Sequence, residues 1–140
     1  MGRLPLQSNR KENDKMGYSV RIKHRDGTDV LLPEKHNIAG GTYAVGGTRD
    51  ARLYVTYNYA GTFQRVIGGE GLRSLNGGSV KDSLAILVKA IDAIGDEQPD
   101  EDYWKPTDGN AKKALVDLKA LANLALKAFP GECLTWEVED

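Results

Sequence analysis

A change in hydrophobic period constrains the fold of this chain more than any other feature of its sequence. Before about residue 60, apolar side chains alternate with polar ones, as at Tyr18, Val20 and Ile22, which is typical of strands with one buried face. After residue 79, apolar side chains recur every third or fourth position, the spacing of an amphipathic helix. The order predicts an α+β fold, in which an N-terminal antiparallel sheet of three or four strands packs against two long amphipathic helices.

The first two strands are expected to form a hairpin. The strand that begins at Tyr18 turns at Asp26-Gly27, a pair that supplies the positive φ angles of a tight turn. The return strand, residues 30–32, is predicted to end at Pro33, because proline has no N–H group to donate to a sheet.

Four further segments have weaker or mixed patterns. Residues 42–45 and 51–59 are expected to be strands, residues 60–78 a short helix and a flexible glycine-rich loop, and residues 134–138 a last short strand or a docked tail. Alternation divides the strand at 51–59 into a core face with Leu53, Val55, Tyr57 and Tyr59, and a face toward solvent or a partner with Tyr54, Thr56 and Asn58.

Two long helices are predicted in the second half of the chain. Ser79 is expected to cap the first, with Asp82 three residues later, and Gly95 ends it. Thr107 or Asp108 is expected to cap the second, whose apolar stripe consists of Ala111, Ala114, Leu115, Leu118, Leu121, Ala122, Ala125 and Phe129.

The composition predicts one cytoplasmic domain. At 140 residues the chain has the length of an ordinary domain, which we place at residues 16–140, behind a polar arm of residues 1–15 that we expect to be disordered. The net charge of -1 disfavours binding to duplex nucleic acid. No apolar run of about 18 residues is present to span a membrane, and the single cysteine, Cys133, suits a reducing compartment.

Residues for catalysis or metal binding are sparse. His24 and His36 are twelve positions apart, and Cys133 has no second cysteine with which to form a ligand pair. The sequence also lacks a spacing that would bring a base to a nucleophile. We therefore expect no metal, no cofactor and no enzymatic activity.

The stretch DYWKPTDGNAKKAL, residues 102–115, carries the strongest binding signal. It has aromatic rings on which a base could stack, and a helix start whose amide groups suit a phosphate. The alternative is that Trp104 fills the core beneath the helix entry and that the lysines point to solvent. The candidate ligand-binding residues are Tyr103, Trp104, Asn110, Lys112 and Lys113, with Arg65 and Arg73 supplying charge from the glycine-rich side.

Three strings in the chain, LYVTYNYAGTF, GLRSLNGG and DYWKPTDGNAKKAL, resemble the first type of anti-Thoeris protein. The resemblance covers the chain from about residue 42 to the C-terminus. Members of that phage and prophage family bind cyclic ADP-ribose-type signals, made by bacterial TIR-domain enzymes, without cleaving them. It implies a homo-oligomer with the ligand near a subunit interface.

The resemblance also implies site residues. The family's asparagine corresponds to Asn110, and its aromatic contact to Tyr103 or Trp104. Arg65 or Arg73 would be the anion clamp. Where relatives carry a further arginine near the C-terminus, this chain offers only Lys127, and lysine cannot grip a pyrophosphate with two parallel hydrogen bonds.

The resulting hypothesis is a phage protein that sequesters a cyclic nucleotide signal, a cyclic ADP-ribose isomer or a cyclic oligonucleotide, in the cytoplasm of the infected bacterium. Two alternatives stay open: a protein–protein inhibitor or structural phage protein whose aromatic residues form an interface, and a nucleotide-cleaving enzyme that uses the acidic residues 96–102. Under the leading hypothesis, Asn110→Ala is expected to weaken ligand binding and to change stability by no more than about 1 kcal/mol, as for a helix cap.

Overall fold

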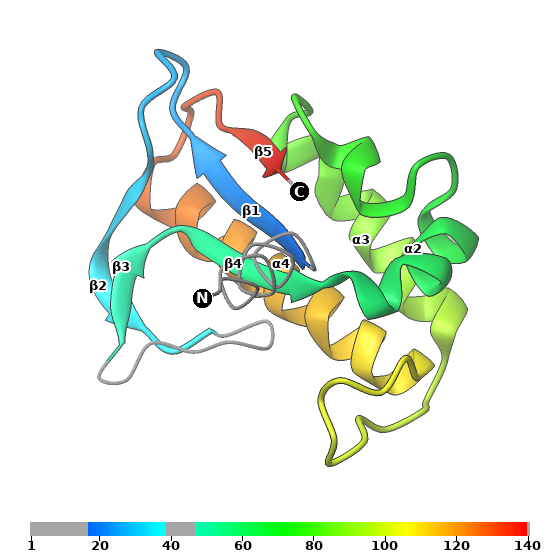
Figure 1. The fold of residues 1–140 in the computed structure, drawn as a ribbon. Helices are drawn as coiled ribbons and strands as arrows, with labels where there is room; N and C mark the ends of the chain where they lie inside the picture. Colours follow the sequence, from blue (N-terminus) through cyan, green and yellow to red (C-terminus); the bar gives the residue numbers. More distant parts are fainter. Residues whose placement is uncertain (1–16, 39–46, 140) are drawn as a thin grey trace, which may run out of the picture.

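The computed structural model describes residues 17–38 and 47–139, and Figure 1 shows how their helices and strands are arranged. The predicted disordered arm at residues 1–15 and the predicted strand at residues 42–45 lie outside the described residues.

A three-stranded antiparallel sheet joins the two ends of the described chain. Its central strand is β1 (Gly17–Lys23), between β4 (Arg52–Thr56) and β5 (Thr135–Glu139). The side chains of β1 alternate between the core and the opposite face, as predicted, with Tyr18, Val20 and Ile22 buried. The C-terminal segment, for which the sequence allowed a strand or a docked tail, is therefore a strand of this sheet.

A second, two-stranded sheet is formed by β2 (Leu31–His36) and β3 (Thr48–Asp50). The predicted hairpin of the first two strands is wrong as to their pairing, because β1 pairs with β4 and β5 while β2 pairs with β3, and the turn between them carries only the isolated bridge of Lys23 with Asp29. The predicted strand end at Pro33 is wrong, because β2 continues through the proline to His36. The pairing register between β2 and β3 shifts between Leu31 and His36, and proline is tolerated at such an irregularity because no ladder hydrogen bond requires its missing N–H.

The predicted strand at residues 51–59 is shorter than expected. After β4 ends at Thr56, the chain turns into a 3-10 helix, η1 (Tyr57–Tyr59), capped by the Thr56 hydroxyl, which accepts a hydrogen bond from the Asn58 N–H at 3.2 Å. The turn breaks the alternation. Thr56 is buried rather than exposed, and Tyr57 is only half-buried.

The predicted short helix is α2 (Ala60–Ile67). The glycine-rich segment that follows it has regular structure instead of being a flexible loop: it forms a 3-10 helix, η2 (Gly71–Leu75). Its side chains Leu72 and Leu75 are buried in the core, and they hold the segment against the rest of the domain.

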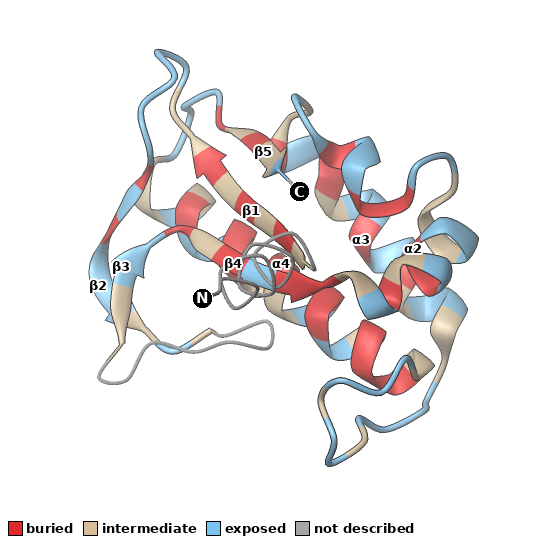
Figure 2. Cartoon of the chain, in the orientation of Figure 1, coloured by how far each residue is buried: buried red, intermediate tan, exposed pale blue. Residues whose placement is uncertain are grey.

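The two long helices begin and end close to the predicted positions. Ser79 caps α3 (Val80–Ile94) by accepting a hydrogen bond from the Asp82 N–H, and Thr107 caps α4 (Asp108–Ala128) in the same way. The predicted stripe of α4 is buried except at Phe129, which is half-buried, and this face of the helix is turned toward the sheet (Figure 2).

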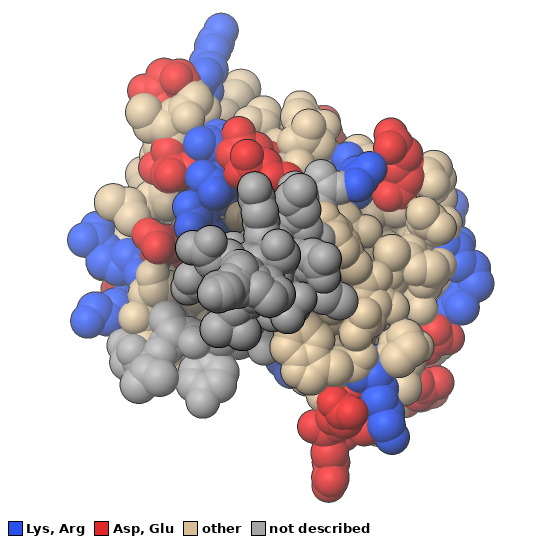
Figure 3. Space-filling view, in the orientation of Figure 1, with Lys and Arg blue, Asp and Glu red and all other residues tan. Residues whose placement is uncertain are grey.

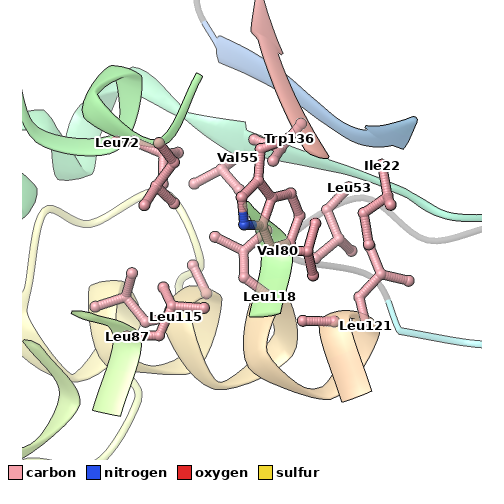
Figure 4. Packing of buried hydrophobic residues seen from close by; sticks show 14 of the residues in the cluster. Ile22, Leu53, Val55, Leu72, Val80, Leu87, Leu115, Leu118, Leu121 and Trp136 are labelled. Atoms are coloured by element: carbon pink, nitrogen blue, oxygen red, sulfur yellow. The ribbon is translucent and has the colours of Figure 1, made fainter. Parts of the chain in front are cut away.

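The core lies between the sheet and these helices. Figure 4 shows Leu115, Leu118 and Leu121 of α4 directed toward residues of the strands, with Trp136 of β5 among them. The indole N–H of Trp136 donates to the Ser83 hydroxyl at 2.7 Å, and that hydroxyl donates to the Val80 carbonyl at 2.7 Å. The buried indole is thus both packed and hydrogen-bonded, as its polar group requires. Among the described residues, no helix is long and apolar enough to cross a membrane.

Candidate functional site

A buried side chain, Asn110, helps to hold the connector between α3 and α4 in place, and it is 4% exposed. Its amide nitrogen donates to the carbonyl oxygens of Asp102 and Lys105, at 3.0 Å each, and its amide oxygen accepts from the Asp100 N–H at 2.8 Å. A buried amide needs partners for its donor and acceptor atoms, and here the chain's own backbone supplies them. The structure therefore gives Asn110 a structural role, and its predicted contact with a ligand stays a prediction.

The predicted anion site at the start of α4 is filled by the protein itself. The Gly109 N–H donates to Glu97 Oε2 at 3.0 Å, and the Asn110 N–H donates to the Thr107 hydroxyl at 3.1 Å. The connector passes so close that a Cβ atom at residue 109 would lie 2.0 Å from the Gln98 carbonyl oxygen. A carboxylate of the chain thus takes the place that the sequence suggested for a phosphate.

The three predicted lysines do not converge on one point. Lys112 donates to the Gly95 carbonyl at the end of α3, where a cation complements the negative end of the helix dipole. Lys113 pairs with Asp117, one turn along α4, at 3.0 Å. Lys127 is exposed in the last turn of α4, about 28 Å along the helix axis from its first residue.

Arg65 connects α2 to the start of α4. Its guanidinium lies 2.7 Å from Asp108 Oδ2, and the Thr62 hydroxyl donates to the other carboxylate oxygen at 3.1 Å. The hydrogen bond from Arg65, followed by that from Thr62, holds the pKa of Asp108 below its usual value. Arg65 therefore already has an anionic partner within the chain.

Of the two aromatic residues in the connector, Tyr103 is partly buried and Trp104 is exposed. The Tyr103 hydroxyl accepts from the Thr56 N–H at 3.2 Å, and the Tyr103 carbonyl accepts from the Tyr59 hydroxyl. Trp104 is 57% exposed, so the alternative in which it fills the core is wrong. Its carbonyl accepts from the Asn58 side chain at 2.7 Å, which fixes the backbone beneath the exposed indole.

Electrostatics disfavour an anionic ligand at this indole. Residues 96–105 carry five acidic side chains and one lysine, and Figure 3 shows acidic side chains at the lower end of the molecule, where the connector lies in Figure 1. Like charges at short range repel, and the repulsion grows as water is displaced. The surface around Trp104 therefore suits a neutral or cationic group better than a phosphate.

A separate cavity of about 360 Å³ lies between the start of β1, η1, α2 and η2. Arg73 is the one predicted site residue that lines it. The other lining side chains that matter chemically are Tyr18, Tyr57, Gln64 and Glu70. Among the described residues, this is where a guanidinium and aromatic rings come together at a hollow large enough for a small molecule.

The wall of this cavity is a pair of tyrosines. The rings of Tyr18 and Tyr57 contact edge to face, with their centroids 4.7 Å apart. Burial raises the pKa of both phenols above the usual value of 10, and the nearby Arg73 charge partly offsets the rise. Both hydroxyls therefore stay protonated at neutral pH, and each can donate a hydrogen bond close to the guanidinium.

Glycines shape the rim of the cavity. Gly68, Gly69 and Gly71 all have positive φ, a conformation that other residues rarely adopt. At Gly71 a Cβ atom would also lie 3.1 Å from the Gln64 backbone nitrogen, so the turn packs tightly against α2. This turn brings Glu70 and Arg73 to the same rim, with Oε1 and Nη1 3.9 Å apart.

Sequence reasoning missed most of this cavity. Alternation correctly placed Tyr18 on the core side of β1, and that placement gave no sign that the residue also lines a cavity. Tyr57 was assigned to a strand that ends one residue earlier. The available signal was the sequence GGEGLR, in which a carboxylate and a guanidinium flank a turn that only glycines can form.

Comparisons with protein-family models, with curated proteins and with solved structures found no match for this chain. The resemblance to the anti-Thoeris family therefore stays a prediction. In the part of the chain that the structure describes, no three His, Cys, Asp or Glu side chains gather into a group that could hold a metal ion.

Asn110→Ala is expected to destabilise the protein by about 2 kcal/mol, since the change leaves partly buried backbone groups of the connector without partners. This exceeds the helix-cap effect that the sequence alone suggested. Urea denaturation gives the loss, and hydrogen exchange should be faster at the Asp100 amide. Asn123→Ala, an exposed change on the same helix, is the matched control. A loss no larger than that of the control would show that Asn110 does not hold the connector.

Asp108→Asn is expected to cost about 1 kcal/mol at neutral pH, because it removes a carboxylate paired with Arg65 in the first turn of α4. The pKa of Asp108 is lowered in the folded protein. The carboxylate therefore stabilises the fold above its unfolded pKa of about 3.9, and this contribution is lost as the pH falls through the folded value.

Thermal unfolding of the wild type and of Asp108→Asn, measured from pH 7 down to pH 2, tests this dependence. The melting temperatures of the two proteins should differ at pH 7 and become equal near pH 2. A difference that stays constant over the whole range would contradict the assignment. Asp92→Asn, at an exposed position on α3, controls for the general effect of losing a negative charge.

Proposed function

We propose that this protein binds a small, anionic, ring-bearing ligand in the tyrosine-walled cavity and sequesters it without cleaving it. The ligand class that we propose is a cyclic nucleotide signal, such as a cyclic ADP-ribose isomer or a cyclic oligonucleotide. The observation that carries the proposal is the convergence of the Arg73 guanidinium with the Tyr18 and Tyr57 phenols at a cavity of about 360 Å³.

The chemistry of the cavity suits a phosphate next to a planar ring. A guanidinium and two hydroxyl groups donate hydrogen bonds to anionic oxygens, and bonds that involve a charged group are the stronger ones. Tyr57 is half-buried and lines the cavity, so it offers a ring against which a base can stack, a contact worth about 1–3 kcal/mol in nucleic-acid binders.

The cavity volume limits how much of a ligand one chain can enclose. A volume of about 360 Å³ is at the lower end of the range for small-molecule sites, which suits one nucleotide unit. A cyclic dinucleotide or a cyclic ADP-ribose isomer would extend beyond it. We therefore include in the proposal a homo-oligomer in which a second copy covers the rest of the ligand.

Sequestration acts by mass action. An abundant protein that binds the signal tightly and releases it slowly keeps the free concentration below the level that the downstream effector needs. In this proposal the protein is phage-encoded, works in the cytoplasm of the infected bacterium, and blocks a defence pathway that depends on such a signal.

Arg73→Gln is expected to weaken the binding of cyclic ADP-ribose or of a cyclic dinucleotide at least tenfold, since a hydrogen bond to a charged group contributes about 1.5–3 kcal/mol. Isothermal titration calorimetry measures the affinity. The melting temperature should change little because Arg73 is exposed. Arg25→Gln removes an exposed arginine from the turn between β1 and β2 and should bind as the wild type does. Equal affinity in both variants would exclude the cavity as the site.

The fate of the ligand separates sequestration from cleavage. The protein is incubated with a stoichiometric amount of the bound signal, heated to denature it, and the supernatant is examined by mass spectrometry. Recovery of the intact molecule supports a sponge, whereas a product of different mass indicates an enzyme.

The exposed Trp104 favours a second candidate function, an interface with another protein. Tryptophan is among the residues most often found at binding hot spots, and this indole lies on a backbone that Asn58 and Asn110 hold in place. Because the surrounding residues are acidic, a partner there would present cationic groups.

Trp104→Ala is expected to leave the fold intact, because the indole is mostly exposed to solvent. Under the interface hypothesis, sedimentation velocity would show lost self-association or lost binding to a partner, while ligand affinity at the cavity stays unchanged. Lost ligand affinity in a folded, normally associated variant would instead place the ligand at the connector.

A further inference from the structure

The rim of the tyrosine-walled cavity carries two opposite charges that are held close together. Glu70 Oε1 lies 3.9 Å from Arg73 Nη1, and both side chains line the cavity. The backbone at Glu70 is fixed on both sides: the Glu70 N–H donates to the Ser74 hydroxyl at 3.1 Å, and the Gly71 N–H donates to the Gly68 carbonyl at 2.9 Å. The carboxylate is therefore presented to the cavity from an ordered turn.

A ligand can displace Glu70 from its ion pair with Arg73. The side chains of Glu70 and Arg73 are 77% and 51% exposed, and exposed pairs contribute little to stability. Losing this one pair therefore costs little when a phosphate takes the place of the carboxylate. Glu70 then remains at the same rim, with a carboxylate that can accept a hydrogen bond from another group of the ligand.

We propose that Glu70 is the specificity-determining residue of this cavity. Its carboxylate accepts a hydrogen bond from an amino group on the ring of a ligand whose anionic group pairs with Arg73. The site therefore takes an amino-bearing base with a phosphate, and it rejects a base that shows a carbonyl at the same place. This inference rests on the proposed function, because it concerns the same cavity.

The discrimination follows from hydrogen-bond chemistry. An ionised carboxylate only accepts hydrogen bonds, so a ring carbonyl opposite Glu70 would leave two acceptors facing each other. Sites that hydrogen-bond a particular group reject analogues without it, because the protein group is then left unpaired. Gln64, which lines the same cavity, does not discriminate in this way, since its amide can either donate or accept.

Two mononucleotides whose bases differ at the C6 substituent, and in the hydrogen that IMP carries on the adjacent N1, test the proposal. AMP carries an amino group on its base where IMP carries a carbonyl, and both have the same phosphate. Titration of the full-length wild-type protein, followed by the backbone amide shifts of residues 68–73, gives both dissociation constants. AMP is expected to bind about tenfold more tightly than IMP, the effect of one hydrogen bond.

Glu70→Gln keeps the shape of the side chain and adds a donor. In this variant IMP should bind more tightly than in the wild type and AMP less tightly, so that the ratio falls to about one. Glu101→Gln, which removes an exposed carboxylate from the connector, is the matched control and should keep the wild-type ratio.

The outcomes separate this inference from the proposed function. Equal affinities for AMP and IMP in the wild type, or the same ratio in Glu70→Gln, would overturn the role of Glu70, while phosphate-dependent binding that is lost in Arg73→Gln would still support the cavity. If neither nucleotide shifts the amides of residues 68–73, the cavity is not a nucleotide site and both proposals fail.

Discussion

The pairing of β5 with β1 is the contact on which the rest of the structure depends. The last described strand lies between β1 and the segment ahead of α3: the Gly77 N–H donates to the Trp136 carbonyl, and the Trp136 N–H donates to the Gly78 carbonyl. The same strand puts the indole of Trp136 into the core and ties it to Ser83 of α3. One edge of the sheet thereby positions η2, and with it the rim on which Arg73 lies.

Residue spacing along the sequence was sufficient to predict those features that depend only on neighbouring residues. The caps at Ser79 and Thr107 and the buried stripe of α4 follow from spacing within a single helix, and the structure has them as predicted. Local rules failed where distant contacts decide. Alternation alone would continue the strand through Tyr59, yet a hydroxyl cap at Thr56 and the packing of Tyr59 against Tyr103 turn the chain instead.

The candidate site was harder to predict for the same reason. A helix start attracts anions only if its amide groups are free, and whether they are free depends on the path of the preceding loop. Here Gly109 lets the connector approach, and Glu97, twelve positions earlier, occupies the amide group. Gly109 thus allows the connector itself to occupy the helix start. Asn110 has the residue type expected of a ligand contact, but its buried side chain is already a partner for four backbone groups of the connector.

Indirect effects on ligand binding follow from the packing between the connector and the cavity. A series of ring contacts leads inward from Tyr103 to Tyr59, then to Phe63 and to Tyr18 at the cavity wall, with centroid separations of 5.6, 6.1 and 6.5 Å. Close-packed rings cannot shift independently, so a loosened connector would also disturb the wall. Lost affinity on changing Asn110 would therefore not identify a ligand contact by itself. The variant identifies one only if affinity falls while the Asp100 amide keeps its protection from exchange, since that protection reports whether the connector has moved.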